Sequence, residues 1–388
     1  MRRARHLLPL LLLLAFFAQG MVHARHASLT FDEGPHLAVG YSTLRTGDFR
    51  LQPVHIHPPL ANVLAALPLL LQHDLPNPQD IDGWEISSLS AITDAVIWQY
   101  DQPKRMAIAG RIPILLLGIL LGALIFRWTQ DLSDSLAGLL ALALYAFDPN
   151  IIAHGSLITT DMAAVVFSMA TLYALQNNLR SRQQIAKWMG VGVLLGLAQL
   201  AKVSALLLVP VIGLMIYIAS CKLQVATWEQ RLARLTRRIL WVFVPAGLVV
   251  WAGYGFEVGA VPGLPLSLPA ATHVKIFLSL REHYALGHPT FLMGRVSDQG
   301  WWWYFPVAFL LKTPLPILLL MLYAVLRSAS SVIRSRVTLH FSSIVIIVFP
   351  MLYAVTSLFS TVNIGYRHLL PMLPFVYIGI GYYTRRMF

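Results

Sequence analysis

The sequence predicts an all-α integral membrane protein, a single domain over residues 1–388 that crosses the bilayer about ten times. Hydrophobic residues make up 57% of the chain and charged residues 12%, whereas a soluble domain carries about a quarter charged residues. Several apolar runs approach the roughly 20 residues that a helix needs to span a bilayer. The single cysteine, Cys221, excludes an intramolecular disulfide framework and a cysteine-cluster metal site.

The first apolar run follows Arg2, Arg3 and Arg5. It is either a retained first helix, which we favour, or a cleaved secretory signal. Both interpretations leave residue 26 outside the cytoplasm. The candidate spans along the chain are residues 7–22, 108–127, 135–147, 160–177, 188–201, 203–220, 239–256, 303–326, 341–359 and 369–383.

Basic residues determine how these runs cross the membrane. Residues 188–220 could form one long helix, but Arg182 and Lys187 precede them and Arg231 and Arg234 follow them. Both clusters favour the cytoplasm, so an even number of crossings must separate them. The resulting topology places the N-terminus and most Lys and Arg residues in the cytoplasm. It therefore explains the formal net charge of +12 without a nucleic-acid partner.

This topology leaves two long extracytoplasmic loops, residues 23–107 and 257–302. Long loops are usually functional. The first is rich in Pro, His and Asp, and the second ends at an aromatic run, WWWY at residues 301–304. Aromatic side chains at that place are typical of a membrane interface.

The first loop contains two groups of polar residues with possible chemical roles. Asp32 and Glu33 lie just beyond the first span, where they could act as general base and positioning group or form a solvated helix start. His55 and His57 follow; such a pair could ligate a metal if extended, but a lone pair usually does not. His57 precedes two prolines, which hold its backbone extended. It could aim an imidazole at a phosphate, or the prolines could simply stiffen the loop.

Further polar residues lie at the predicted outer ends of the spans. Asp161 begins one span, where it either caps a helix or lines a site. Lys202 and Lys312 lie within apolar surroundings. A lysine in hydrocarbon costs about 2.5–3.5 kcal/mol on insertion scales, so each should snorkel or meet an anion. Arg367 and His368 stand at the outer start of the last span.

All of these residues can converge at the outer membrane boundary, where a lipid-linked phosphate presents its head group. There, cations would stabilise a leaving phosphate and a carboxylate would accept a proton from an attacking hydroxyl. The alternative is a transporter of lipid or solute that uses the same polar cluster, but it should show midplane charges, broken helices and paired repeats. A membrane scaffold whose outer loops bind partners is a third possibility.

Five stretches in this order resemble the GT-C glycosyltransferases that use lipid-phosphate sugars, a family 39-like pattern. The similarity is greatest to protein O-mannosyltransferases and to the aminoarabinose transferases of lipid A. The stretches lie between residues 31 and 374 and read FDEGPHLAVGYSTLRTGDFRLQPVHIHPPL, LITTDMA, GLAQLAKVSALLLVP, GHPTFLMGRVSDQGWWWYFPVAFLLKTPLPILLL and NIGYRHLLPMLP.

The resemblance implies that a hexose or pentose is transferred, with inversion, from an undecaprenyl- or dolichyl-phosphate donor to a protein, lipid or glycan acceptor. The active site would be extracytoplasmic, and a plasma or inner membrane is favoured over an endoplasmic reticulum. The resemblance identifies no definite cofactor, and a divalent cation could take part. The catalytic residues would be Asp32, as the base, and Glu33. The donor-phosphate and substrate-binding residues would be His57, Asp161, Lys202, Lys312, Arg367 and His368.

The chain also departs from these families. Protein O-mannosyltransferases usually continue the HPPL stretch with Gly-Lys, but this chain has Ala61 and Asn62. Its second loop is too short for their additional lumenal β-trefoil. Aminoarabinose transferases carry a lysine where His57 stands. The sequence therefore does not identify the acceptor.

Overall fold

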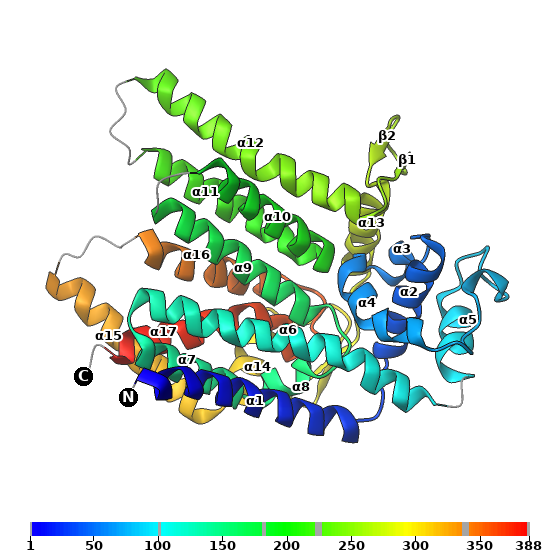
Figure 1. Cartoon of the computed structure of the whole chain (residues 1–388), viewed down its shortest axis with the longest axis horizontal. Coiled ribbons are helices and arrows are strands. Elements are labelled where there is room, and N and C mark those ends of the chain that lie inside the picture. Colours follow the sequence, from blue (N-terminus) through cyan, green and yellow to red (C-terminus); the bar gives the residue numbers. More distant parts are fainter. Residues whose placement is uncertain (1, 100–101, 181–183, 222–226, 336–340, 386–388) are drawn as a thin grey trace.

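The computed structural model describes residues 2–99, 102–180, 184–221, 227–335 and 341–385, so residues 100 and 101 of the first loop lie outside it. The all-α prediction is confirmed, because strands in the described residues form only two small antiparallel hairpins. Figure 1 shows long helices running side by side, with both termini at one end and the short helices of the first loop at the other.

Each predicted span is helical in the structure, although several differ in length from the prediction. The corresponding elements are α1 (Arg2–His26), α6 (Pro103–Leu132), α7 (Ser135–Ala146) with α8 (Pro149–Gly155), α9 (Asp161–Arg180), α10 (Ile185–Ala201), η4 (Val203–Leu207) with α11 (Leu208–Cys221), α12 (Trp228–Gly253), α14 (Tyr304–Lys312) with α15 (Leu315–Ser335), α16 (Phe341–Leu358), and η5 (Tyr366–Met372) with α17 (Leu373–Arg385). Among the described residues, four helices are long and apolar enough to cross a membrane, or up to six if each of two bent pairs is one span. The chain is thus a multi-pass membrane protein, and the count of ten crossings stays a prediction.

One predicted span is broken. Residues 303–326 were expected to form a single helix, but α14 and α15 meet at a bend of 112°. Thr313, between them, is extended, with φ −77° and ψ 131°. The cause is Pro314, because a proline disfavours helical backbone at the residue before it. A second pair, α7 and α8, bends by 65°.

The first loop is folded into helices rather than open. Its elements are α2 (Glu33–Thr46), α3 (Gln52–His55), α4 (Pro59–Ala66), η1 (Leu67–Leu71), η2 (Pro78–Asp80), α5 (Leu89–Thr93) and η3 (Asp94–Trp98). It is also shorter than predicted, because α1 continues to His26 and α6 begins at Pro103. Helices α2 and α4 pack so closely that a Cβ added at Gly40 would lie 2.0 Å from the carbonyl oxygen of Asn62.

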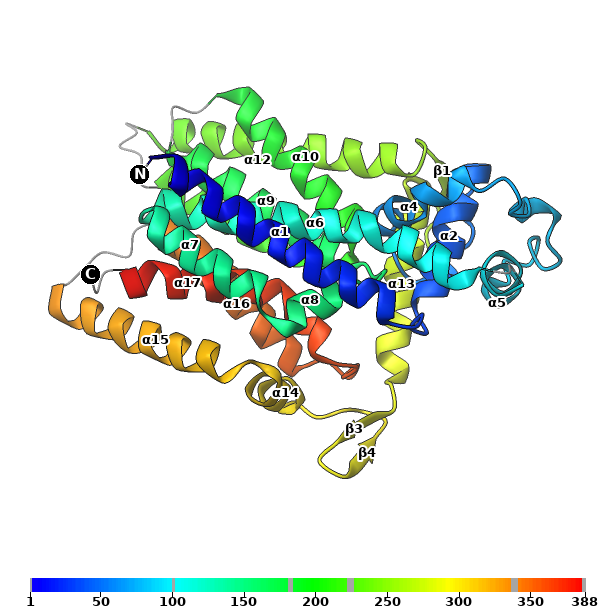
Figure 2. The ribbon, with the colours of Figure 1, turned by 60° about the horizontal axis from the view of Figure 1, so that its bottom comes forward.

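The second loop contains two hairpins with a helix between them. Strand β1 (Val258–Ala260) pairs with β2 (Ser267–Pro269), and β3 (Thr290–Leu292) pairs with β4 (Arg295–Ser297). Helix α13 (Ala271–Leu286) lies between the hairpins in sequence and packs against α3 of the first loop. The two loop segments therefore meet at one end of the long helices, and Figure 2 shows the β3–β4 hairpin standing out beside them.

Candidate active site

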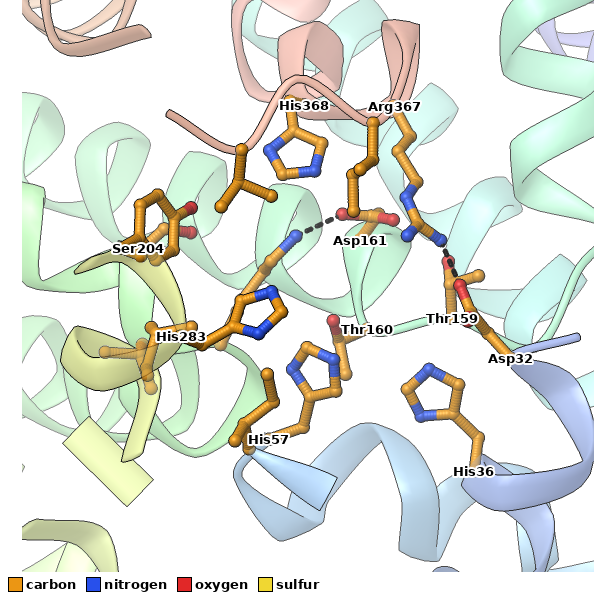
Figure 3. Close-up of a pocket in the computed structure, with 17 residues that line it drawn as sticks. Asp32, His36, His57, Thr159, Thr160, Asp161, Ser204, His283, Arg367 and His368 are labelled. Carbon is orange, nitrogen blue, oxygen red and sulfur yellow. Dashed lines mark hydrogen bonds and ion pairs between the residues drawn. The ribbon is translucent and has the colours of Figure 1, made fainter. Parts of the chain in front are cut away.

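A cavity with several charged and polar side chains in its wall lies where the two loop segments meet the long helices, with about 680 Å³ of empty space that is partly open to solvent. Its walls come from α2, the turns before α4 and α9, the α10–η4 junction, α13 and η5. Most of the predicted site residues line this one cavity, and Figure 3 shows Asp32, Asp161 and Arg367 pointing toward one another. The predicted residues that line the cavity are Asp32, His57, Asp161, Lys202, Arg367 and His368.

The cavity contains two ion pairs. Arg367 pairs with Asp32, and Lys202 pairs with Asp161. Asp161 is the more deeply buried carboxylate, whereas the Asp32 side chain is 36% exposed. Each cation is thus matched by one acid, and Asp32 is the acid that a molecule entering the cavity can reach.

Three histidines form a cluster at the base of the cavity. The ring centroids of His36 and His55 are 4.4 Å apart, and that of His57 is 5.3 Å and 5.0 Å from them. Nδ1 of His36 lies 2.7 Å from Oδ1 of Asn62, whose Nδ2 lies 3.4 Å from Nδ1 of His55. The rings pack against one another, and the described residues contain no group of three or more His, Cys, Asp or Glu placed to bind a metal.

Acidification is expected to destabilise the protein through this cluster. Burial lowers the pKa of His36, and lowers those of His55 and His57 further. Below the pKa of an unfolded-state histidine, about 6.5, the unfolded chain therefore binds more protons than the folded protein. The free energy of unfolding then falls as the pH decreases, by up to about 1.4 kcal/mol per pH unit for each histidine.

This pH dependence can be measured as the unfolding midpoint at pH 7.5 and at pH 5.5. A His55→Gln variant should lose less stability on acidification than the wild type. The exposed His73 provides the control, since His73→Gln should leave the difference unchanged. Equal losses in all three proteins would contradict the assignment.

Glu33 lies behind the cavity rather than in it. Its fully buried carboxylate accepts hydrogen bonds from Nε and Nη2 of Arg111, at 2.8 and 2.6 Å, and from the backbone of Thr30 and Ile158, at 2.8 and 3.0 Å. Burial raises its pKa, but these hydrogen bonds, that of Arg111 foremost, bring it below the ordinary value. Glu33 therefore fixes the start of α2 and the turn before α9, which carry Asp32 and Asp161.

Lys312 lines a neighbouring cavity rather than the central one. That cavity has about 880 Å³ of empty space and shares Asp32 and Arg367 with the central cavity. A further cavity, of about 720 Å³, adjoins the other side and shares Tyr284 and His368. The central cavity thus has one neighbour on the side of Asp32 and another on the side of His368.

Several residues of the central cavity were not predicted from the sequence. They are His36, Thr160, Ser204, His283 and Tyr284. His36 follows Asp32 by four residues, a spacing that places two residues on one face of a helix, so it could have been found. His283 and Tyr284 lie on α13, and no local pattern connects that helix to the cavity.

Known proteins and protein families resemble this chain in sequence or in structure. A family model described as dolichyl-phosphate-mannose-protein mannosyltransferase matches residues 104–251. The structure is similar to that of ArnT from Cupriavidus metallidurans bound to undecaprenyl phosphate, with a TM-score of 0.59 and 14% identity over 98% of this chain. It is also similar to the archaeal oligosaccharyltransferase AglB from Archaeoglobus fulgidus in complex with an inhibitory peptide and a dolichol-phosphate, with a TM-score of 0.56 and 12% identity over 98% of this chain.

The matched proteins all belong to the GT-C superfamily, as the sequence pattern predicted. The chain spans 60% of the length of ArnT and 50% of that of the oligosaccharyltransferase. No curated protein sequence matches it. At these identities the similarity establishes the GT-C fold.

Proposed function

We propose, with the GT-C fold as the premise, that this chain transfers a sugar from a polyprenyl phosphate to an extracytoplasmic acceptor. One observation carries the proposal: Asp32, Asp161, Lys202 and Arg367 share a single cavity at one end of the apolar helices. An accessible carboxylate beside two cations suits the departure of a phosphate and the activation of a hydroxyl.

Asp32 is the proposed base. Its carboxylate would accept the proton of the acceptor hydroxyl while the acceptor oxygen bonds to the anomeric carbon of the sugar. The bond from that carbon to the phosphate oxygen breaks at the same time, and polyprenyl phosphate leaves with the electron pair. A single displacement of this kind inverts the anomeric configuration. Glu33, whose oxygens are occupied by Arg111 and backbone amides, has a positioning role.

The donor phosphate would bind in the central cavity, near Lys202, Arg367 and His57. Its lipid chain would extend into the adjoining cavity, where Leu207, Phe305 and Phe359 provide apolar surface among Tyr, Ser, Thr and His side chains. The structure of ArnT with undecaprenyl phosphate supports such a donor.

The acceptor would enter through the cavity that contains Lys312, because that cavity meets the central one at Asp32. The inhibitory peptide bound to the archaeal relative makes a peptide one candidate acceptor. A divalent cation in the site remains a hypothesis that metal removal would test.

The two lysines should have separable effects on transfer. We expect Lys202→Gln to raise the donor KM by about 10- to 100-fold, since a hydrogen bond to a charged group contributes about 1.5–3 kcal/mol. Lys312→Gln should instead raise the acceptor KM and leave the donor KM unchanged. Steady-state kinetics with each substrate varied in turn would measure both constants. An equal effect of both variants on the donor would contradict this placement.

The proposed function can be tested with purified protein in vesicles. Radiolabelled sugar on undecaprenyl or dolichyl phosphate is supplied on the extracytoplasmic side, together with peptide, lipid and glycan acceptors. Label that moves to an acceptor supports the transferase. Label that crosses the vesicle membrane on unchanged lipid supports the alternative function, a transporter. The two bent helix pairs are the structural feature that favours this alternative, because transporters often contain broken helices. If neither occurs, the proposal fails.

A further inference from the structure

An exposed apolar face lies on the β3–β4 hairpin. Phe291 pairs with Val296 across the two strands, and their side chains are 67% and 72% exposed. Met293, in the connecting turn, is 71% exposed. Directly paired residues lie on the same side of a hairpin. One side of this hairpin therefore presents large apolar side chains that no other described residue covers.

The apolar side chains of the hairpin are followed along the chain by further exposed apolar side chains on α14 and α15. Helix α15 carries the exposed Leu319 and Leu322, and α14 carries the exposed Leu310 and Leu311. Because α14 bends by 112° from α15, α14 would lie close to the membrane plane where α15 spans the bilayer. Trp302, also exposed, joins α14 to the hairpin.

The position of the β3–β4 hairpin along the long axis of the molecule is consistent with a location beside the lipid head groups. The long axis is horizontal in both ribbon views, and Figure 2 shows the hairpin at the side of the bundle, next to α14. It is level with the last turns of α1 rather than with α5, which lies farther out at the extracytoplasmic end. A hairpin beyond that end would face water, but one beside the last turns of a spanning helix faces the lipid head groups.

We propose that the β3–β4 hairpin inserts its Phe291, Met293 and Val296 side chains into the outer leaflet of the membrane. Arg295 extends from the opposite side of the hairpin and is exposed, so its guanidinium can reach the lipid phosphates. Trp302 lies at the boundary that tryptophan prefers. This membrane contact does not depend on the proposed sugar transfer.

The hairpin is linked to the roof of the central cavity. It follows α13, whose His283 and Tyr284 line the cavity. Just after the hairpin, the backbone N–H of Trp301 donates to Oδ1 of Asn363 at 2.7 Å. The hydroxyl of Thr361 donates to the carbonyl oxygen of Tyr284 at 2.6 Å. Insertion of the hairpin would thus attach both α13 and the segment leading to η5 to the bilayer surface.

Site-directed fluorescence can test the insertion. In a Cys221→Ser background, an environment-sensitive NBD label is placed on Met293→Cys, and the full-length protein is reconstituted into phosphatidylcholine–phosphatidylglycerol vesicles. The matched control is Leu266→Cys, next to strand β2 of the other hairpin, because Leu266 is 70% exposed and thus equally accessible. Both positions are exposed, so neither substitution should disturb folding.

We expect the label at residue 293 to emit at shorter wavelength than the label at residue 266. Lipids with a nitroxide on the acyl chain should quench the label at residue 293 at least about twofold more strongly, because an apolar group at the interface is buried roughly 5–10 Å into the head-group and acyl boundary. Aqueous iodide should show the reverse preference. Equal iodide quenching at both positions would overturn the proposal. So would protection of residue 293 from both quenchers, because a second copy of the chain would then cover the hairpin.

Discussion

Replacing Asp32 with asparagine is expected to reduce sugar transfer by about 10²- to 10⁴-fold, the usual contribution of a positioned general base. Asparagine has the same shape and can still contact Arg367, but it cannot accept the proton of an attacking hydroxyl. The lost rate should therefore appear in kcat rather than in the donor KM. Single-turnover measurements with prebound donor would isolate the chemical step.

Asp48→Asn is the matched control for this variant. Asp48 also pairs with an arginine, Arg50, and its side chain is 32% exposed, close to the 36% of Asp32. It does not line the described cavities, so its substitution should leave turnover unchanged. Normal turnover of Asp32→Asn would remove Asp32 from the mechanism, whereas slow turnover of both variants would indicate a general structural effect.

Replacing Arg111 with methionine is expected to have the largest effect on stability. Arg111 is fully buried, binds both oxygens of Glu33, and donates to the backbone carbonyls of Ala24, Ala27 and Ser28. The variant leaves a buried carboxylate without its cation, a change that costs about 3–5 kcal/mol. The measurement is the thermal unfolding midpoint of the purified protein in detergent.

Arg127→Met provides the comparison for Arg111→Met. Arg127 also pairs with an acid, Asp131, but its side chain is mostly exposed. Surface pairs of this kind contribute about 0–1 kcal/mol, so the midpoint should change little. If the buried Glu33–Arg111 pair holds the site in place, Arg111→Met should lower the unfolding midpoint clearly more than Arg127→Met does. Similar midpoints for the two variants would show that the Glu33–Arg111 pair does not hold the site in place.

The fold class and the convergence of most of the polar residues on one cavity could be predicted because both depend on local features of the sequence. Apolar length indicates which segments form long helices, and the positions of basic residues predict which of their ends lie on the same side. The polar residues at the outer ends of those spans, such as Asp161 and Arg367, then had to meet at one side. The bend at Thr313 was harder to predict. Pro314 indicates a break in the helix, but the packing of α14 determines the angle.

The site residues that the sequence assigned differently depend on contacts between distant segments. The sequence assigned Glu33 to the reaction together with Asp32. Its ion-pair partner, Arg111, lies 78 residues away in an apolar run, so no local pattern showed that the Glu33 carboxylate is already occupied. His283 was missed because α13 reaches the cavity by packing on α3. Such contacts are set by tertiary packing, which composition and spacing do not encode.

The contrast between Asp32 and Glu33 has a wider consequence for adjacent acids at a helix start. Successive side chains on a helix point about 100° apart, so two neighbouring acids can face different surroundings. Here, one carboxylate meets the open space and the other turns inward to join three segments of the chain. Under the proposed mechanism, Glu33 is the group that holds the reactive Asp32 in place. Shortening Glu33 by one methylene, as in Glu33→Asp, would then misplace Asp32 without changing it.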